Sequence, residues 1–342
     1  MTKDGRFDHS LYGLLDDPAA DAGHADHPPR VGFFTDTSVC IGCKACEVAC
    51  KEWNLVPDDG MNLLGMSFDN TGMLGASSWR HVAFIEQSQQ LGHQDPGVEG
   101  LPTGPSSAPE TSAIVAEALR ATERGGGQLG TTPIELVTSP TLPGDGVWDG
   151  NRGDFRWLMM SDVCKHCTHA GCLDVCPTGA LFRTEFSTVV VQQDICNGCG
   201  FCVSGCPYGV IDRAPEDGRA HKCTLCYDRL KGGMEPACAK ACPTDSIQFG
   251  DLDELRERAR GRVEQLHEAG VPQAKLYGEN PDDGVGGDGA FFLLLDEPEV
   301  YGLPPDPVVP TRDLISMWKW AGYAAAAFLA AAVGAFAGSE RR

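Results

Sequence analysis

The chain has 342 residues, 16 of them cysteine, and a formal net charge of −21 at pH 7. This length leaves room for two modest domains, or for one domain with insertions. So acidic a composition argues against a nucleic-acid partner, because proteins that bind nucleic acid present basic surfaces to the phosphates.

Residues 1–30 form a polar segment that includes several His, Asp and Pro residues. The segment has no apolar stretch and no twin arginine, so no export signal is visible in it. We expect it to be a flexible or surface-draped arm. The apolar residues Val31–Phe34 follow and predict a short strand.

The first cysteine group follows this strand, within residues 31–86. Its spacing is C-x2-C-x2-C-x3-C, which matches the run that holds an iron–sulfur cluster in bacterial ferredoxins. Three thiolates so close together can occupy three corners of one Fe4S4 cube. The group comprises Cys40, Cys43, Cys46 and Cys50.

Residues 87–153 differ in character and contain no cysteine. Runs such as Gly125–Gly127 are typical of loops, and residues 111–124 could form one short helix. We interpret the segment as an insertion that makes a surface excursion, with a partner-docking loop as the alternative.

Three further cysteine groups follow the insertion. Two lie in residues 154–215, separated by the β-branched run Thr188–Val191, which predicts a short strand between two cluster loops. The last lies in residues 216–250, and eleven residues separate its second cysteine from its third. The groups are Cys164, Cys167, Cys172 and Cys176; Cys196, Cys199, Cys202 and Cys206; and Cys223, Cys226, Cys238 and Cys242.

All 16 cysteines belong to these four groups, so four thiolates per cluster give four [4Fe–4S] clusters. Zinc is the alternative, but structural zinc sites favour well-separated C-x2-C pairs, a pattern that only the last group shows. Disulfides fit poorly, because packed C-x2-C-x2-C runs do not give the Cβ separation that a disulfide requires. His166, His169 and His221 lie near cysteines, and we interpret them as polar surface residues rather than ligands.

The fourth cysteine of each run ligates the other cluster in two-cluster ferredoxins. The two adjacent groups therefore pair with each other, and the first and last groups pair across the chain. This predicts an α+β fold of two nested two-cluster ferredoxin-like modules, with residues 154–215 inserted between halves at 31–86 and 216–250. The expected ligand sets are Cys40, Cys43, Cys46 and Cys242; Cys223, Cys226, Cys238 and Cys50; Cys164, Cys167, Cys172 and Cys206; and Cys196, Cys199, Cys202 and Cys176.

Residues 251–310 predict a helical and stranded subdomain. A helix begins at Asp251, and its apolar residues recur at a spacing of three to four between Leu252 and Leu266. Gly284–Gly289 matches G-x-G-x-x-G, but it follows a turn-rich stretch and precedes a strand candidate at Phe291–Leu295. We therefore interpret it as a loop and not as a nucleotide site.

The C-terminal residues 311–342 contain the uncharged run Ala321–Gly338. Its length is at the lower edge of the ~17–25 residues that span a bilayer. Trp318, Trp320 and Tyr323 at one end suit an interfacial belt. We predict one transmembrane helix, with a soluble alanine-rich helix as the alternative.

Four stretches carry a family resemblance: Asp36–Asn54, Lys222–Cys226, Glu235–Cys238 and Tyr301–Pro304. In these stretches the chain resembles the β subunit of membrane-bound respiratory formate dehydrogenases. The resemblance covers residues 31–86 and 154–338, and the insertion departs from it. Electron-transfer subunits of other molybdenum enzymes share the cysteine groups.

The resemblance implies a non-catalytic electron-transfer subunit with four [4Fe–4S] clusters and two partners. One partner is a catalytic α subunit with a molybdenum or tungsten pterin site that oxidises formate; the other is a membrane cytochrome b γ subunit that reduces quinone. The chain would cross the lipid bilayer of the cell membrane once, with its cluster domain on the extracytoplasmic face. The alternatives are the same role in another molybdenum oxidoreductase, such as a sulfur-compound reductase, or a zinc-stabilised structural subunit.

Overall fold

The computed structural model of the chain describes residues 15–58, 60, 68–69, 71–88 and 155–339, together with His9 and Gly13. Most of these residues belong to one compact unit, which comprises Met1–Asn62, Asp69–Ile85 and Leu158–Arg342. A second unit comprises Leu63–Phe68 and Glu86–Trp157. The predicted insertion at 87–153 lies outside the described residues except at its first two positions, and so does its predicted helix at 111–124.

A four-stranded sheet forms the core of the larger unit, with the strand order β8-β1-β10-β9. Its strands are β1 (Val31–Asp36), β8 (Ile247–Asp251), β9 (Lys275–Tyr277) and β10 (Ala290–Leu294). β1 runs parallel to β10 and antiparallel to β8, and β10 runs antiparallel to β9. The strand predicted at Val31–Phe34 is thereby confirmed. The β1–β8 pairing joins the chain just before the first cysteine group to the chain just after the last.

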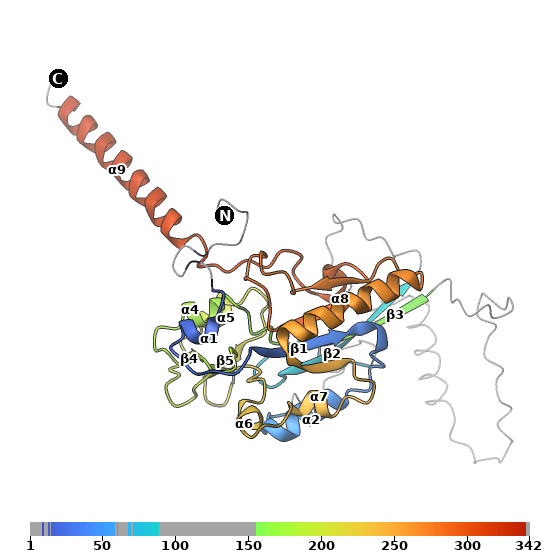
Figure 1. Cartoon of the computed structure of the whole chain (residues 1–342). Coiled ribbons are helices and arrows are strands. Elements are labelled where there is room, and N and C mark those ends of the chain that lie inside the picture. The colour runs from blue at the N-terminus through green and yellow to red at the C-terminus, as the bar shows by residue number, and fades with distance from the viewer. Residues whose placement is uncertain are drawn as a thin grey trace, which may run out of the picture. The chain divides into compact units, whose positions relative to one another are not determined.

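Helix α8 (Leu252–Glu268) lies along this sheet in Figure 1. The Asp251 side chain caps the helix by accepting hydrogen bonds from the N–H groups of Asp253 and Glu254. The apolar face that begins with Leu252 packs against Phe34 of β1. Both the helix and its apolar face are confirmed, because the capping residue and the helical periodicity are local features of the sequence.

Alternate residues of β1 serve two different cores, since successive side chains of a strand point to opposite faces of the sheet. Phe34 belongs to the core under α8. Phe33 belongs to a second core that includes Val82 of strand β2 (Arg80–Ser88) and Val163 of strand β3 (Phe155–Val163). Four cysteines, one from the second group and the others from the first and last, belong to the same core: Cys46, Cys164, Cys223 and Cys238.

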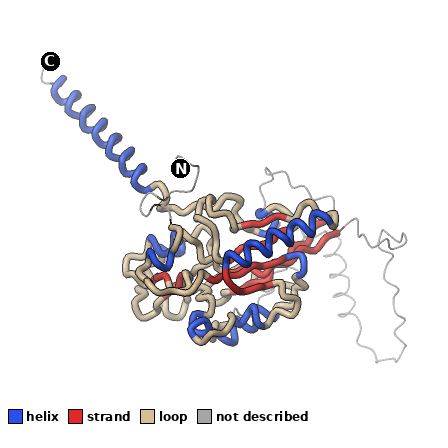
Figure 2. Tube along the Cα trace, in the orientation of Figure 1, coloured by secondary structure: helices blue, strands red, loops and turns tan. Residues whose placement is uncertain are grey.

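Short elements carry the cysteines, and Figure 2 shows how much loop connects them. Helices α2 (Ala45–Asn54) and α7 (Ala237–Lys240) pack together, and so do α4 (Gly171–Asp174) and α5 (Phe201–Gly205). Strand β5 (Val189–Val191) confirms the predicted strand and pairs antiparallel with β4. The remaining elements are α1 (Pro18–Asp21), η1 (Thr37–Val39), β4 (Leu181–Arg183), β6 (Asp212–Arg213), β7 (Ala220–His221), α6 (Tyr227–Lys231) and η3 (Pro298–Tyr301).

Two glycines allow α4 and α5 to approach closely. A Cβ atom on Gly171 would lie 2.4 Å from the carbonyl oxygen of Gly205, and one on Gly205 would lie 2.8 Å from Val175. Because contacts this short leave no room for a side chain, the glycines set the distance between the two helices. Cys172 in α4 and Cys202 in α5 are held together in this way.

The described part of the N-terminal arm is draped over the chain and attached to it by hydrogen bonds. His24 Nε2 lies 3.0 Å from the carbonyl oxygen of Arg183. Arg30 donates hydrogen bonds to the Thr168 hydroxyl at 2.8 Å and to the carbonyl oxygen of His166 at 3.2 Å. The arm therefore supports the loop of the second cysteine group.

Helix α9 (Leu314–Ser339) is the C-terminal element in Figure 1. In the part of the chain that the structure describes, α9 is the one helix that is long and apolar enough to cross a membrane. The apolar segment covers the 23 residues Leu314–Phe336, and its most apolar stretch is not buried against the rest of the chain. The helix begins several residues before the uncharged run at Ala321–Gly338, so it includes the aromatic residues that precede that run.

Candidate iron–sulfur sites

Each C-x2-C loop makes the same backbone turn. The residue just before the second cysteine has a positive φ in all four groups: 65° at Gly42, 46° at His166, 72° at Gly198 and 55° at Leu225. Backbone turns of this kind direct successive N–H groups into a concavity that binds anions, including iron–sulfur clusters. Glycine adopts this conformation freely, whereas a residue such as Leu225 does so at a cost of about 1–2 kcal/mol.

Three cavities in the described part of the chain are each lined by four cysteines. In every case three cysteines come from one group and the fourth is the last cysteine of another group. The lining sets are Cys40, Cys43, Cys46 and Cys242; Cys164, Cys167, Cys172 and Cys206; and Cys196, Cys199, Cys202 and Cys176.

The remaining four cysteines also lie close to one another. Asn54 Nδ2 lies 3.7 Å from Cys50 Sγ and 3.8 Å from Cys226 Sγ. Burial raises the pKa of the Cys50 thiol, and the charges of Cys223, Cys238 and Cys226 raise it further. Cys50, the last cysteine of the first group, therefore lies among three cysteines of the last group.

Two of the cysteines that precede proline, Cys176 and Cys206, receive backbone hydrogen bonds. Burial alone would raise the pKa of Cys176, but N–H groups of Leu181, Thr178 and Ala180 outweigh this effect and lower the pKa. N–H groups of Tyr208, Gly209 and Val210 also reach Cys206, but burial outweighs them and raises the pKa of that thiol. Because proline has no N–H of its own, the donors come from the residues that follow it.

The remaining thiols favour metal binding over free thiolates. None of the 16 cysteines forms a disulfide. Burial raises the pKa of Cys46 and of Cys202 to about 11, and it raises the pKa of Cys223 beyond that. Isolated thiolates are disfavoured in such surroundings, whereas a bound metal deprotonates the thiol and shares its charge. The residues therefore fit iron–sulfur clusters.

One buried cation, Arg80 at the start of β2, lies between two cysteine sets. Its Nη2 donates to Cys238 Sγ at 3.3 Å. Its Nη1 donates to the hydroxyl of Ser161 at 3.2 Å, and that hydroxyl lies 3.2 Å from Cys46 Sγ. Although burial lowers the pKa of Arg80, the nearby thiolates, with Cys238 first, raise it above its ordinary value.

A second buried cation, Lys222, lies between the set that contains Cys223 and the set that contains Cys164. Its Nζ lies 3.6 Å from Cys164 Sγ and 3.0 Å from the carbonyl oxygen of Cys223. It also donates to the carbonyl oxygen of Val189. Lys222 thus touches the second cysteine group through Cys164 and the last group through Cys223.

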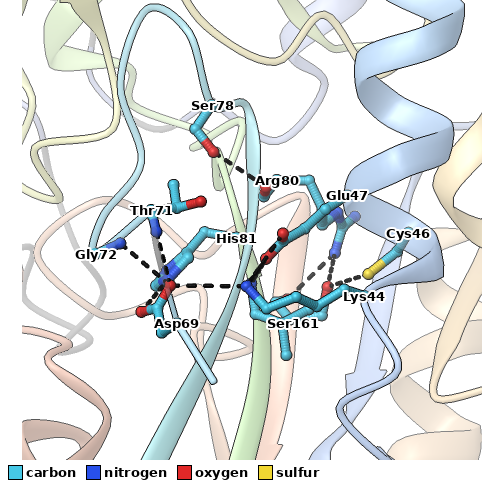
Figure 3. Close-up of polar contacts among 11 residues, drawn as sticks. Lys44, Cys46, Glu47, Asp69, Thr71, Gly72, Ser78, Arg80, His81 and Ser161 are labelled. Carbon is cyan, nitrogen blue, oxygen red and sulfur yellow. Dashed lines mark hydrogen bonds and ion pairs between the residues drawn. The ribbon is translucent and has the colours of Figure 1, made fainter. Parts of the chain in front are cut away.

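Figure 3 shows a polar network beside the first cysteine group. Lys44 Nζ lies 3.3 Å from Glu47 Oε1 and 3.6 Å from Asp69 Oδ1. Glu47 also accepts a hydrogen bond from the N–H of Val82, and His81 Nε2 donates to Asp69 Oδ2 at 2.8 Å. The network ties the first cysteine loop and α2 to strand β2.

Two family models described as a 4Fe-4S dicluster domain match residues 155–252 and 39–180. The iron–sulfur subunit of the nitrate-inducible formate dehydrogenase of Escherichia coli is 35% identical over 315 residues, which cover 90% of this chain and 84% of that relative. The chain belongs to the formate dehydrogenase iron–sulfur subunit family. The formate dehydrogenase iron–sulfur subunit of Haemophilus influenzae is 33% identical, over 86% of this chain and 74% of that relative. The B subunit of the anaerobic dimethyl sulfoxide reductase of E. coli is 28% identical, over 67% of this chain and 77% of that relative.

As a formate dehydrogenase iron–sulfur subunit, the chain contains [4Fe–4S] domains of ferredoxin type, and the family resemblance is confirmed. The prediction that His166 and His169 are surface residues is wrong, since they are only 2% and 3% exposed. Their backbone is covered by the glycine-rich loop: the N–H of His169 donates to the carbonyl oxygen of Val285, and Gly289 lies against His166. His221 is partly exposed.

Sequence reasoning missed the two cations between the cysteine sets. Lys222 could have been noticed because it directly precedes Cys223. Arg80 had no local signal, since it lies far from every cysteine in the sequence and reaches Cys238 through the fold. Ser161, which connects Arg80 to Cys46, was missed for the same reason.

Replacement of Asp69 tests how much the network of Figure 3 contributes to stability. Asp69 is 5% exposed and accepts hydrogen bonds from His81 and from the N–H groups of Thr71 and Gly72. We expect Asp69→Ala to lower the free energy of unfolding by about 3–5 kcal/mol, because it leaves buried partners unpaired. The measurement is thermal unfolding of the iron-loaded chain.

The control for this prediction is Asp253→Ala. The Asp253 side chain is 89% exposed and pairs with Arg256, so its loss should cost less than about 1 kcal/mol. The effect at Asp69 should also depend on pH. Burial alone would raise the pKa of Asp69, but the hydrogen bonds from His81 and from the two N–H groups outweigh it and lower the pKa. The contribution of Asp69 to the free energy of unfolding is therefore complete near neutral pH and shrinks as the pH falls below about 4. Equal destabilisation by both variants would contradict the structural role of the network.

Proposed function

We propose that the chain binds four [4Fe–4S] clusters through ligand sets that cross between cysteine groups, in two nested modules. The observation that carries this proposal is the composition of the cysteine-lined cavities, each of which combines three cysteines of one group with the last cysteine of another. The fourth set would be Cys50, Cys223, Cys226 and Cys238. A zinc scaffold is the weaker alternative, because the 4Fe-4S dicluster models match across the cysteine groups.

The nested division of the chain follows from the same pairing. We assign residues 31–86 and 216–250 to an outer module and residues 154–215 to an inner one. Residues 1–30, 87–153, 251–310 and 311–342 would be the arm, the insertion, the C-terminal subdomain and the membrane segment. The pairing of β1 with β8 and of α2 with α7 supports this division, since both contacts join the two outer segments.

The four sets form a row in this proposal. Arg80 connects Cys46 of the first set to Cys238 of the second, and Cys223 of the second set lies near Cys164 of the third. Cys172 of the third set lies near Cys202 of the fourth. Bound clusters supply one-electron reduction and oxidation, so the row would conduct electrons.

The two ends of the row are the places for partners. Cys43 in the first set and Cys199 in the last set are the two exposed cysteines of the chain. Exposed apolar side chains flank both, namely Ile41 and Val48 at one end and Ile195 and Phe201 at the other. An exposed cysteine with exposed apolar side chains beside it suits the docking of another subunit. The docked subunit would exclude water from the site where electrons enter or leave.

The membrane end is proposed to be that of Cys196 and Cys199. Thr311, just before α9, donates a hydrogen bond to Asp174 at 2.5 Å. Asp174 lies between Cys172 of the third set and Cys176 of the fourth. Electrons would therefore enter near Cys43, from a catalytic subunit with a molybdenum or tungsten pterin, and leave near Cys199, toward a membrane cytochrome b and quinone.

Formate is the proposed source of the electrons. The relatives named for formate dehydrogenase match 86–90% of this chain, whereas the dimethyl sulfoxide reductase relative matches 67% with lower identity. Further proposals from the family are that the chain itself catalyses no reaction and that its cluster domain lies on the extracytoplasmic face. A sulfur-compound reductase remains the second candidate, because it shares the electron-transfer role.

Formate should reduce the clusters only when the catalytic subunit is present. We expect formate to bleach the broad visible absorption of the purified complex, and to leave the isolated iron-loaded chain unchanged. Dithionite, which reduces both samples, is the control for cluster content. Bleaching of the isolated chain by formate would overturn the non-catalytic role. If formate does not reduce the complex, the catalytic subunit acts on another substrate.

Removal of α9 tests the membrane anchor. A chain that ends at Arg312 lacks the apolar helix Leu314–Ser339. The large apolar side chains of this helix are exposed in the isolated chain, and a bilayer would bury them. We expect the truncated chain, expressed without partners, to move from the membrane fraction to the soluble fraction after a carbonate wash. Retention of the truncated chain on membranes would show that another part of the chain is the anchor.

Crossing of the ligands can be tested with Cys50→Ser. The proposal predicts a changed EPR signal for the cluster of Cys223, with the cluster of Cys40 largely intact. Cys226→Ser should then add little to Cys50→Ser, because effects within one site are not additive. The control is Cys43→Ser, which should alter the other signal. If Cys50→Ser and Cys43→Ser perturb the same signal, each cysteine group binds its own cluster and the nested arrangement is wrong.

A further inference from the structure

We propose that Lys222 and Arg80 are positioning residues for electron transfer, each of which holds a fixed positive charge between two neighbouring clusters and raises the reduction potential of both. This inference rests on the proposed function, since it requires the four ligand sets. It concerns two electron transfers, from the first set to the second and from the second set to the third. Arg80 lies between the first two of these sets, and Lys222 lies between the second and the third.

Lys222 lies between the second and third sets, where the two proposed modules meet. Its side chain is 2% exposed, and its Nζ reaches Cys164 Sγ of the third set at 3.6 Å. Its other contacts are carbonyl oxygens, of Val189 in β5 and of Cys223 in the second set. Among the residues that the structure describes, no carboxylate forms an ion pair with it. Its charge is therefore left to be balanced by the thiolates and the clusters that they hold.

Arg80 occupies the step within the outer module. It is 1% exposed, and its two terminal nitrogens reach Cys238 directly and Cys46 through the Ser161 hydroxyl. Its guanidinium carbon lies 4.8 Å from the centre of the Phe33 ring of β1, which excludes water from one side. In the described ranges of the chain it forms no ion pair with a carboxylate either.

Two other buried cations near the cysteines, Lys165 and Arg183, make no hydrogen bond to a cysteine sulfur, which sets Lys222 and Arg80 apart. Lys165 is 1% exposed and follows Cys164, but its Nζ forms an ion pair with Asp162. Arg183 donates its hydrogen bonds to the carbonyl oxygens of Ser187, Cys167 and Thr168 rather than to any cysteine sulfur. Lys222 and Arg80 alone of the four direct a nitrogen at a cysteine sulfur.

The physical consequence follows from the low dielectric of the site. A positive charge stabilises the more negative, reduced state of a cluster, and hydrogen bonds to sulfur and net charge are the features by which a protein sets cluster potentials. Water screens this effect at the surface but not for a buried group. A cation shared by two clusters raises both reduction potentials together, so the difference in potential between the two clusters changes little.

The experiment is an EPR-monitored redox titration of the complete, iron-loaded complex, with signals assigned by single Cys→Ser variants. Lys222→Met should lower the potentials of the second and third sets, which contain Cys223 and Cys164. Arg80→Met should lower those of the first and second sets. We expect the ratio of reduced to oxidised cluster at a fixed potential to fall about tenfold, which is 59 mV for one electron. The last set, with Cys199, should shift in neither variant.

Two matched variants separate charge from packing. Lys222→Arg keeps the charge and should keep the potentials close to those of the wild type. Lys240→Met removes a positive charge that is also close to cysteines in sequence, two residues from Cys238 and from Cys242, but its side chain is 71% exposed. Solvent screens this exposed charge, so its loss should leave all the potentials unchanged.

The outcomes decide between the inference and the function on which it rests. Unchanged potentials in Lys222→Met, or equal shifts in Lys222→Met and Lys222→Arg, would overturn the inference while the four wild-type signals uphold the proposed function. Fewer than four signals in the wild type would instead contradict the proposed function. If Lys222→Met loses iron, Lys222→Gln and Arg80→Met provide the same test, and a shift confined to one cluster in Arg80→Met would count against a shared cation.

Discussion

Burial of many thiolates within one small core is the constraint on which the structure depends. Burial alone raises the pKa of thiols such as Cys223 and Cys172, so their charged form requires compensation. Bound metal would supply part of it, and the backbone contributes through the turns before each second cysteine and through the N–H groups that follow Cys176-Pro177 and Cys206-Pro207. The loops are short and irregular because their main task is to direct N–H groups, not to form helices or strands.

The central sheet places these loops by using both faces of one strand. Phe34 on one face of β1 packs under α8, whereas Phe33 on the other face belongs to the core that contains cysteines of three different groups. The sheet is therefore the scaffold that gives an otherwise loop-rich region a conventional apolar core. Strand β10, buried at every residue, extends the same support from the C-terminal subdomain.

Local features of the sequence predicted much of the fold and most of the candidate site. The cysteine spacing predicted the sets that line the three cavities, the cap at Asp251 and the apolar period predicted α8, and β-branched residues predicted β5. The buried state of His166 was not predictable in the same way, because the loop that covers it lies more than one hundred residues later in the chain. Arg80 was missed for the same physical reason: a cation that reaches a cysteine across the fold leaves no periodic pattern in the sequence.

The pairing of β1 with β8 has a consequence for the order in which the molecule can form. β1 is synthesised early, but its partner strands β8 and β10 lie near the other end of the described chain. Contacts so distant in sequence carry a large loop-closure cost and form slowly. With the proposed ligand sets, Cys46 would wait for Cys242 to leave the ribosome, whereas Cys164 and Cys206 would emerge close together. In the proposed nested arrangement, the inner pair of metal sites would be completed first on the growing chain, and the outer pair would form afterwards.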